Sequence, residues 1–173
     1  MNFNLNQLKI KPLTPEYYDQ NLELLNSGIS ENHFLARMNP VTKEESMGFV
    51  DHFSQFSNTI YLIATLKDKL VGHIFALPRI EELLSHIVNI GYLVHVDYRK
   101  IGVCSKLMDA LIEEARRKRN IRIMIAEVAE DNEASINVLK KFGFTEFGKV
   151  RRGFMKKNEE FIDLLYFSKH LEK

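Results

Sequence analysis

The sequence predicts an α/β fold built on a mixed sheet. Strand-like and helical segments alternate through the centre of the chain, which is typical of parallel strand neighbours. On both flanks, short turns separate β-rich runs and favour antiparallel neighbours. The chain has 173 residues without an internal repeat or a Pro/Gly/Ser-rich linker, so we expect one domain over residues 1–173.

The first elements are predicted from the residue types at their ends. Residues 8–13 are expected to form a short strand. Thr14 and Pro15 match a helix N-cap followed by proline at the first helical position. We therefore expect a helix from this point to about Asn26, with Gly28 as its stop.

A capping box and a short turn predict the next elements. Thr42-Lys43-Glu44-Glu45 matches the capping box of a second helix that runs to about Phe56. The β-rich runs 59–66 and 69–77 are joined by Lys67-Asp68, which indicates a hairpin. The later elements are expected in this order: strand 86–96, helix 102–119, strand 121–128, helix 131–142 with Gly143 as its αL terminator, and strands 144–153 and 160–168.

Charge and composition exclude several functional classes. The 24 basic and 23 acidic side chains give a formal net charge of +1, so no nucleic-acid partner is expected. No window approaches 18 apolar residues and the N-terminus lacks a signal-peptide core, so no membrane span is expected. Cys104 is the only cysteine, which fits a reducing cytoplasm and excludes an intramolecular disulfide.

The segment Arg99-Lys100-Ile101-Gly102-Val103-Cys104 is a candidate phosphate site between a strand and a helix. Gly102 permits a tight turn. The N–H groups of residues 102–106, Ser105 among them, are expected to lack partners within the helix. The helix dipole favours an anion at that position. By spacing alone, a simple turn explains the segment equally well. The sequence has neither a P-loop nor a G-x-G-x-x-G motif, which disfavours a nucleoside-triphosphate or nicotinamide ligand.

Three motifs in order resemble the GNAT family of acetyl-coenzyme A-dependent N-acetyltransferases. The first is the loop at residues 99–104, which matches [Q/R]-x-x-G-x-[G/A]. The others are Asp131-Asn132-Glu133-Ala134-Ser135-Ile136 at a helix start and Lys140-Lys141-Phe142-Gly143-Phe144 at its end. The resemblance implies about seven strands and about four helices, with the sheet splayed between the fourth and fifth strands. It is closest to members that acetylate amino acids or the N-termini of ribosomal proteins.

The resemblance also implies how acetyl-coenzyme A is held, with no metal involved. Main-chain groups of Leu93, Val94 and Val96 would pair with the pantetheine arm. Residues 99–105 would hold the pyrophosphate, and Asn132 would bond the pantetheine arm with Ser135 nearby. Asn132 also suits a helix N-cap, and both roles coexist if Asp131 provides the cap.

The sequence departs from the family pattern at two positions. Cys104 stands where glycine or alanine is usual, and it is either a structural residue or a thiol activated by the helix N-terminus. Leu139 stands seven positions after Asn132, where many members have a tyrosine that protonates the leaving thiolate. Tyr92 and Tyr166 are alternative proton donors, and each is also compatible with an ordinary place in a sheet.

Two residues are candidate general bases. Glu127 ends a predicted strand on the face of Ile123 and Ile125, so its side chain is expected to point inward, and it matches the catalytic glutamate of N-terminal acetyltransferases. His86 begins the fourth strand, and neutral imidazole accepts a proton near pH 7. Either side chain is also compatible with a structural role, Glu127 in water or a salt bridge and His86 at the surface or in the core.

Two functions remain open from the sequence. The first is transfer of an acetyl group from acetyl-coenzyme A directly to a primary amine of a small molecule, amino acid or peptide N-terminus, in a ternary complex. The alternative, motivated by Leu139, is a coenzyme A-binding sensor or scaffold. Arg151-Arg152 either holds a substrate carboxylate or is exposed strand charge. Exposed sheet edges at the C-terminus are compatible with a homodimer.

Overall fold

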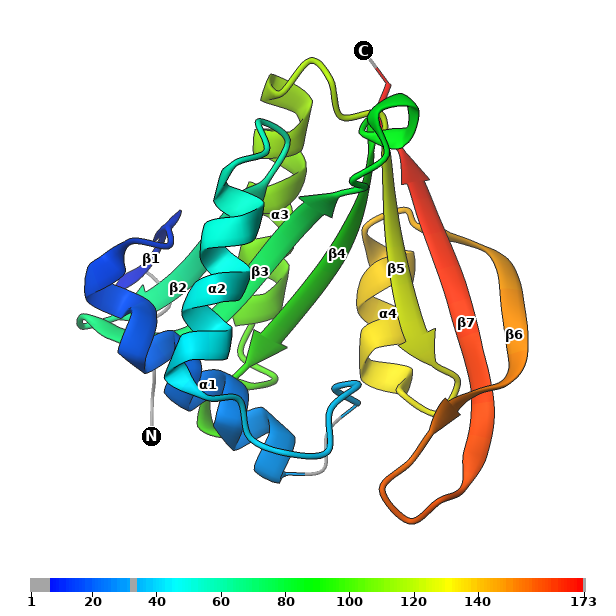
Figure 1. Ribbon diagram of the computed structural model, residues 1–173, viewed down its shortest axis with the longest axis horizontal. Coiled ribbons are helices and arrows are strands. Elements are labelled where there is room, and N and C mark those ends of the chain that lie inside the picture. Colours follow the sequence, from blue (N-terminus) through cyan, green and yellow to red (C-terminus); the bar gives the residue numbers. More distant parts are fainter. Residues whose placement is uncertain (1–6, 32–33, 173) are drawn as a thin grey trace.

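The computed structural model describes residues 7–31 and 34–172, which form a seven-stranded sheet with helices on both faces (Figure 1). The elements are β1 (Leu8–Pro12), η2 (Pro15–Tyr17), α1 (Tyr18–Ser30), α2 (Lys43–Ser54), β2 (Ile60–Leu66), β3 (Lys69–Pro78), η3 (Glu82–Leu84), β4 (Ile87–Val94), η4 (Val96–Tyr98), α3 (Val103–Arg117), β5 (Ile123–Ala129), α4 (Glu133–Lys141), β6 (Thr145–Met155) and β7 (Phe161–His170). The strand order is β1-β2-β3-β4-β5-β7-β6. Neighbouring strands are antiparallel except β4 and β5, which confirms the predicted mixed, largely antiparallel sheet.

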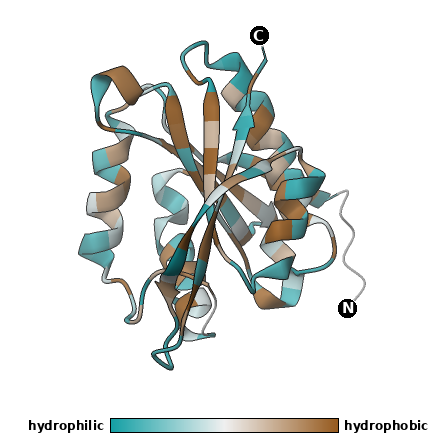
Figure 2. Ribbon diagram, turned by 90° about the vertical axis from the view of Figure 1, so that its right-hand side faces the viewer, coloured by the Kyte–Doolittle hydropathy of each residue, from teal (hydrophilic) through white to brown (hydrophobic). Residues whose placement is uncertain are grey.

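Apolar side chains on the two faces of the sheet form separate clusters. The larger cluster joins the strands to α3 and α4, and its helical members include Leu107, Leu111 and Leu139. The smaller cluster joins Leu24 of α1 to Ile63 and its neighbours on the other face. Figure 2 shows apolar residues concentrated along the strands that these helices cover. Within residues 7–31 and 34–172, no helix has both the length and the apolar character needed to cross a membrane.

Local signals in the sequence predict several element ends correctly. Thr42 Oγ1 accepts from Glu45 N at 3.2 Å, and Thr42 N donates to Glu45 Oε2 at 2.8 Å, so the capping box forms. Lys67 and Asp68 have φ values of 50° and 63°, the conformation that a tight hairpin turn requires. Gly143 has a φ of 75° and follows α4, as expected for an αL terminator.

The prediction that Gly28 stops the first helix is wrong, because α1 continues to Ser30. Gly28 is buried against the sheet instead. A Cβ atom at this position would lie 2.8 Å from Leu93 Cδ2 and 3.0 Å from Leu35 Cδ1. The glycine is therefore explained by the close approach of α1 to β4, a tertiary contact that no local pattern reveals.

The predicted strand over residues 86–96 is shorter at both ends than expected. It begins at Ile87 and ends at Val94, because the chain turns into η4 at Val96. His95 Nδ1 accepts from Asp97 N at 3.3 Å and caps this short turn. Because β4 ends early, η4 separates the sheet from the candidate phosphate loop.

A buried polar cluster lies between α1 and the sheet. His73 Nδ1 bonds Asn21 Oδ1 at 2.7 Å, and Asn21 Nδ2 donates to the Tyr61 hydroxyl at 2.9 Å. Burial lowers the pKa of His73 from 6.5 to about 4, because the charged imidazole would lose its hydration. The neutral ring donates through Nδ1 to Asn21, so the folded state excludes a proton that the unfolded chain binds.

This exclusion predicts an acid-sensitive stability. As the pH falls from about 6.5 to about 4, the unfolded chain gains a proton at His73 and the free energy of unfolding decreases, by on the order of 3 kcal/mol in full. Urea unfolding at several pH values measures the decrease. His73→Gln is expected to reduce the slope relative to the parent protein, whereas the exposed His170→Gln keeps it. Equal slopes in the parent and His73→Gln would contradict the assignment.

Candidate active site

The site is organised by the divergence of β4 and β5. The two parallel strands pair over three residues only, Ile87–Asn89 with Ile123–Ile125. Beyond these pairs β4 continues to Val94 and β5 to Ala129, and the strands separate toward their C-terminal ends (Figure 1). The predicted splay of the sheet is therefore present, and we refer to the space between residues 90–94 and 126–129 as the slot.

Even-numbered residues of β4 direct their main-chain groups toward the slot. Arg79 N donates to Ile87 O at 3.1 Å, and His95 N donates to Val71 O at 2.9 Å, so odd-numbered residues of β4 bond β3. Since the pairing alternates in an antiparallel ladder, Tyr92 and Val94 face β5 instead.

The expectation that Leu93 pairs with the pantetheine arm is therefore wrong, because its main chain pairs with His73 of β3. Val96 lies beyond β4, at the start of η4, and its carbonyl accepts from Arg99 N at 3.3 Å, so only its N–H group stays a predicted contact for the arm. Val94 alone of the three expected residues both faces the slot and remains in a strand.

The β5 side of the slot follows from the same alternation. Leu171 N donates to Arg122 O at 2.9 Å, and Glu130 N donates to Asp163 O at 3.0 Å, so even-numbered residues of β5 bond β7. Glu127 and Ala129 consequently direct their main-chain groups toward β4. Unpaired main-chain groups on two facing strands are the arrangement to which an extended ligand with amide groups binds as an added strand.

The loop after η4 forms a candidate anion site at the start of α3. Gly102 is the N-cap residue and has a φ of 98°, a conformation that strongly favours glycine. Val103 and Ile101 anchor the loop by packing in the core, while the N–H groups at the start of α3 have no partners within the helix. Lys141 Nζ donates to Ser105 Oγ at 3.1 Å and brings a cation to this point. Lys141 was not identified from the sequence, because the contact depends on how α4 packs beside α3.

The Arg99 side chain contacts the ends of α1 and β4, and its role in holding the pyrophosphate stays a prediction. Its Nη2 atom donates to Glu31 Oε2 at 2.9 Å, and its Nε atom donates to Val94 O at 2.8 Å. The side chain thus connects the end of α1 to the end of β4. Lys100 is an exposed cation within the loop, and Lys141 is a second cation beside it.

Cys104 and Tyr92 lie behind the slot, on the side of α3 and α4. Burial raises the pKa of the Cys104 thiol to about 11, which favours the structural role over a reactive thiolate. The Tyr92 hydroxyl donates to Ser135 O at 3.4 Å, and burial raises the pKa of this phenol too.

Of the two residues that suit the N-cap of α4, Asn132 and not Asp131 provides the cap. Asn132 Oδ1 accepts from Ser135 N at 3.2 Å, so Asn132 is the N-cap and its side-chain amide retains donors for a ligand. Asp131 instead pairs with Lys156 from the far end of β6. Both residues stand at the C-terminal end of β5, beside the slot.

Glu127 and Tyr166 are brought together, whereas His86 is separate from them. Glu127 pairs directly with Tyr166 across β5 and β7, so both side chains lie on the face opposite α3 and α4. The Glu127 side chain is exposed, so the expected inward orientation is wrong: α1 and α2 do not cover this part of the sheet. His86 lies in the turn before β4, seven residues or about 23 Å of strand from Leu93.

Leu139 is fully buried in the core cluster. The apolar side chain is thus part of the packing between α4 and the sheet. No proton donor is present at this position of α4, as expected from the sequence.

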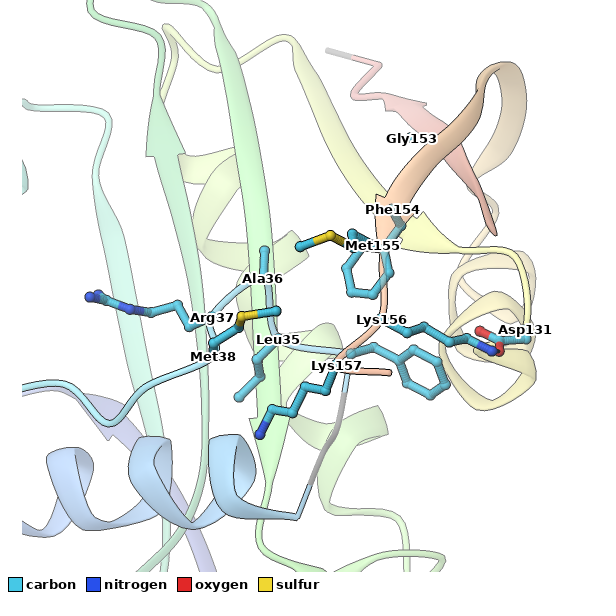
Figure 3. Close-up of a pocket in the computed structure, with 11 residues that line it drawn as sticks. Leu35, Ala36, Arg37, Met38, Asp131, Gly153, Phe154, Met155, Lys156 and Lys157 are labelled. Carbon is cyan, nitrogen blue, oxygen red and sulfur yellow. Dashed lines mark ion pairs between the residues drawn. The ribbon is translucent and has the colours of Figure 1, made fainter. Parts of the chain in front are cut away.

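A cavity of about 410 Å³ lies at the open end of the slot. Figure 3 shows Leu35 and Met38 on one side and Phe154 and Met155 on the other, with Lys156 directed toward Asp131. The sequence identified none of these lining residues, because segments 34–38 and 153–157 meet only in the folded chain. Arg151 and Arg152 are not among the lining residues that the structure describes, and the Arg152 guanidinium lies over the Phe161 ring at 5.4 Å.

Comparison with known proteins agrees with this geometry. The model of the acetyltransferase (GNAT) family matches residues 30–144, more than half of the chain. The chain therefore belongs to the GNAT family of acetyltransferases.

Two curated relatives show the range of named activities. An N-alpha-acetyltransferase of Sulfurisphaera tokodaii is 29% identical over 122 residues, which cover 65% of this chain and 71% of the relative. The L-amino acid N-acetyltransferase AaaT of Escherichia coli is 28% identical over 108 residues, which cover 62% of this chain and 66% of the relative.

Solved structures share the fold over nearly the whole chain. A GNAT-family acetyltransferase from Streptococcus pneumoniae has a TM-score of 0.87 at 24% identity, covering 95% of this chain and 99% of that chain. A putative acetyltransferase from Salmonella typhimurium, yncA, was solved with its cofactor acetyl-CoA and has a TM-score of 0.88 at 20% identity, covering 97% of this chain and 96% of that chain.

The anion site predicts that Gly102→Val weakens coenzyme A binding. A β-branched residue at a φ of 98° costs on the order of 1–2 kcal/mol, so the loop is expected to leave its geometry and the dissociation constant to rise at least tenfold. Isothermal titration with coenzyme A measures the change. Gly48→Ala is the matched control, because a Cβ at Gly48 meets no atom within 4 Å. Unchanged affinity in Gly102→Val would contradict the loop assignment.

Proposed function

We propose that this protein transfers an acetyl group from acetyl-coenzyme A directly to a primary amine while both substrates are bound. The observation that carries the proposal is the slot, whose two walls present main-chain groups at Val94 and Glu127 next to the anion site at Gly102. A pyrophosphate attached to an extended arm with amide groups has the chemistry that both features bind.

In this proposal the donor occupies a defined path. The N–H groups of residues 102–105 hold the pyrophosphate, with Lys100 and Lys141 as nearby cations. The pantetheine arm lies between Val94 on β4 and Glu127 and Ala129 on β5. The side-chain amide of Asn132 donates to the arm, and the Val94 N–H is the candidate donor to the thioester carbonyl oxygen, where negative charge develops during attack.

The reaction requires a neutral amine. An α-amine has a pKa of about 7.7 to 8.0, so an appreciable fraction is neutral near pH 7.5, whereas a lysine amine at about 10.4 is almost wholly charged. The amine nitrogen attacks the thioester carbon, and the nitrogen loses a proton as the C–N bond forms. Glu127 lies on β5 beside the slot, and its side chain is exposed on the face of the sheet opposite α3 and α4. In this proposal the Glu127 carboxylate accepts the proton directly or through one water molecule.

The leaving step breaks the C–S bond and releases coenzyme A as a thiolate that then takes up a proton. Because a simple thiol has a pKa near 8.5, the group leaves without strong assistance. Tyr166 lies directly beside Glu127 in the β5–β7 register and is our candidate proton donor. Leu139 cannot donate, and the Tyr92 hydroxyl is bonded to Ser135 O.

The role of Glu127 is tested by Glu127→Gln. Removing the base is expected to lower kcat by about 10²–10⁴, with the coenzyme A dissociation constant unchanged. Steady-state acetyl transfer and isothermal titration give the two quantities. Glu146→Gln, at an exposed carboxylate on β6, which β7 separates from β5, is the matched control and is expected to retain full activity. Full activity of Glu127→Gln would remove Glu127 from the mechanism.

A second candidate function is a coenzyme A-binding sensor or scaffold, and the buried Leu139 is the observation that favours it. This reading expects coenzyme A to raise the melting temperature while no amine in a broad panel is acetylated. Turnover of acetyl-coenzyme A with any amine excludes a purely binding role. Absence of a thermal shift with coenzyme A counts against both functions.

A further inference from the structure

We infer that the acceptor is an apolar residue with a free α-amine, such as methionine, leucine or phenylalanine, whose side chain enters the cavity lined by segments 34–38 and 153–157. The inference rests on the proposed function and specifies its acceptor. The inference is drawn from the residues that line the cavity, because the slot is proposed to bind only the acetyl donor.

The cavity lies at the correct place to hold an acceptor. Leu35, in its wall, meets Leu93 of β4 at Gly28, where a Cβ would touch both leucine side chains within 3.0 Å. On the opposite side the wall includes Asp131, directly before Asn132 at the end of β5. The cavity therefore extends from the β4 side to the β5 side of the slot, where the thioester carbon of a bound donor would be reached.

Large apolar side chains around the cavity are exposed to water. The exposed fraction is 37% for Phe34, 50% for Met38 and 46% for Met155, and Phe154 adds a further aromatic ring. Exposed apolar groups gathered around one hollow mark a binding surface for an apolar ligand. Two of them are methionines, whose flexible side chains adjust to apolar groups of different shape.

The charged side chains that line the cavity already have partners within the described residues. Arg37 Nη2 lies 3.2 Å from Glu45 Oε1, and Lys157 Nζ donates to the main-chain oxygen of Ile29. Lys156 pairs with Asp131 and lies 3.3 Å from Glu160 Oε2. A charged acceptor side chain would have to displace one of these contacts, and its desolvation would be poorly compensated.

The inferred acceptor needs an α-amine beside an apolar side chain, and more than one kind of molecule carries this pair of groups. A free amino acid and a peptide N-terminus both supply an apolar side chain beside such an amine. They differ in the α-carboxylate, which only the free amino acid carries. The experiment below therefore includes both sources.

The test measures acetyl transfer from acetyl-coenzyme A to short peptides that differ only in the first residue, together with the corresponding free amino acids. We expect kcat/KM for methionine, leucine and phenylalanine to exceed that for glycine, aspartate and lysine at least tenfold. Turnover of the peptides or of the free amino acids identifies the source of the amine, and the stated preference in either set supports the inference.

The cavity is tested by Met38→Asp, which places a charge in its apolar wall. This variant is expected to raise KM for the apolar acceptors at least tenfold without changing the coenzyme A dissociation constant. Met47→Asp is the matched control, because Met47 is 40% exposed on α2 and does not line the cavity. The control is expected to behave as the parent protein.

The outcomes separate this inference from the proposed function. Acetylation without preference for the side chain, or with preference for glycine or charged residues, overturns the inference and leaves the proposed function standing. An unchanged KM in Met38→Asp also overturns it. If coenzyme A binds and no amine is acetylated, the proposed function fails and the inference fails with it.

Discussion

The parallel pairing of β4 with β5 ends after three residue pairs, and the rest of the site depends on that early end. Polar main-chain groups at the edge of a sheet need partners, and beyond Asn89 and Ile125 the two strands no longer supply them to each other. The N-terminus of α3 follows the end of β4, and the N-terminus of α4 follows the end of β5. One divergence therefore gathers main-chain groups, a helix-dipole anion site and the Asn132 cap around the same space.

Much of the fold was predictable because its signals are local. The capping box at Thr42, the turn at Lys67-Asp68 and the αL residue Gly143 each act within a few residues, so the sequence indicates them directly. Gly28 shows the limit of such signals. The same residue type suggests a helix stop, yet here it permits contact with Leu93, 65 positions further along the chain.

The candidate site was predicted in part, for a related reason. The anion loop at Gly102 and the strand-end Glu127 follow from motif and position. Which residues of β4 direct their main-chain groups toward the slot depends on the bonds of β4 to β3, and these bonds turn Leu93 away from it. The Arg99 side chain forms an ion pair with Glu31 of α1, a residue far from it in sequence. The contact of Lys141 with Ser105 and the cavity between segments 34–38 and 153–157 both arise from packing between elements distant in sequence, and no local pattern encodes that packing.

Two lysines just after β6, Lys156 and Lys157, contact residues on the two sides of the slot. Lys157 contacts Ile29 at the end of α1, which lies against β4, and Lys156 pairs with Asp131 after β5. The connection between β6 and β7 thus bridges the open end of the slot, opposite the short β4–β5 ladder. The same segment lines the cavity that we infer to hold the acceptor. Under the proposed function, substitutions in this segment are therefore expected to change the range of acceptors and the separation of β4 from β5 together.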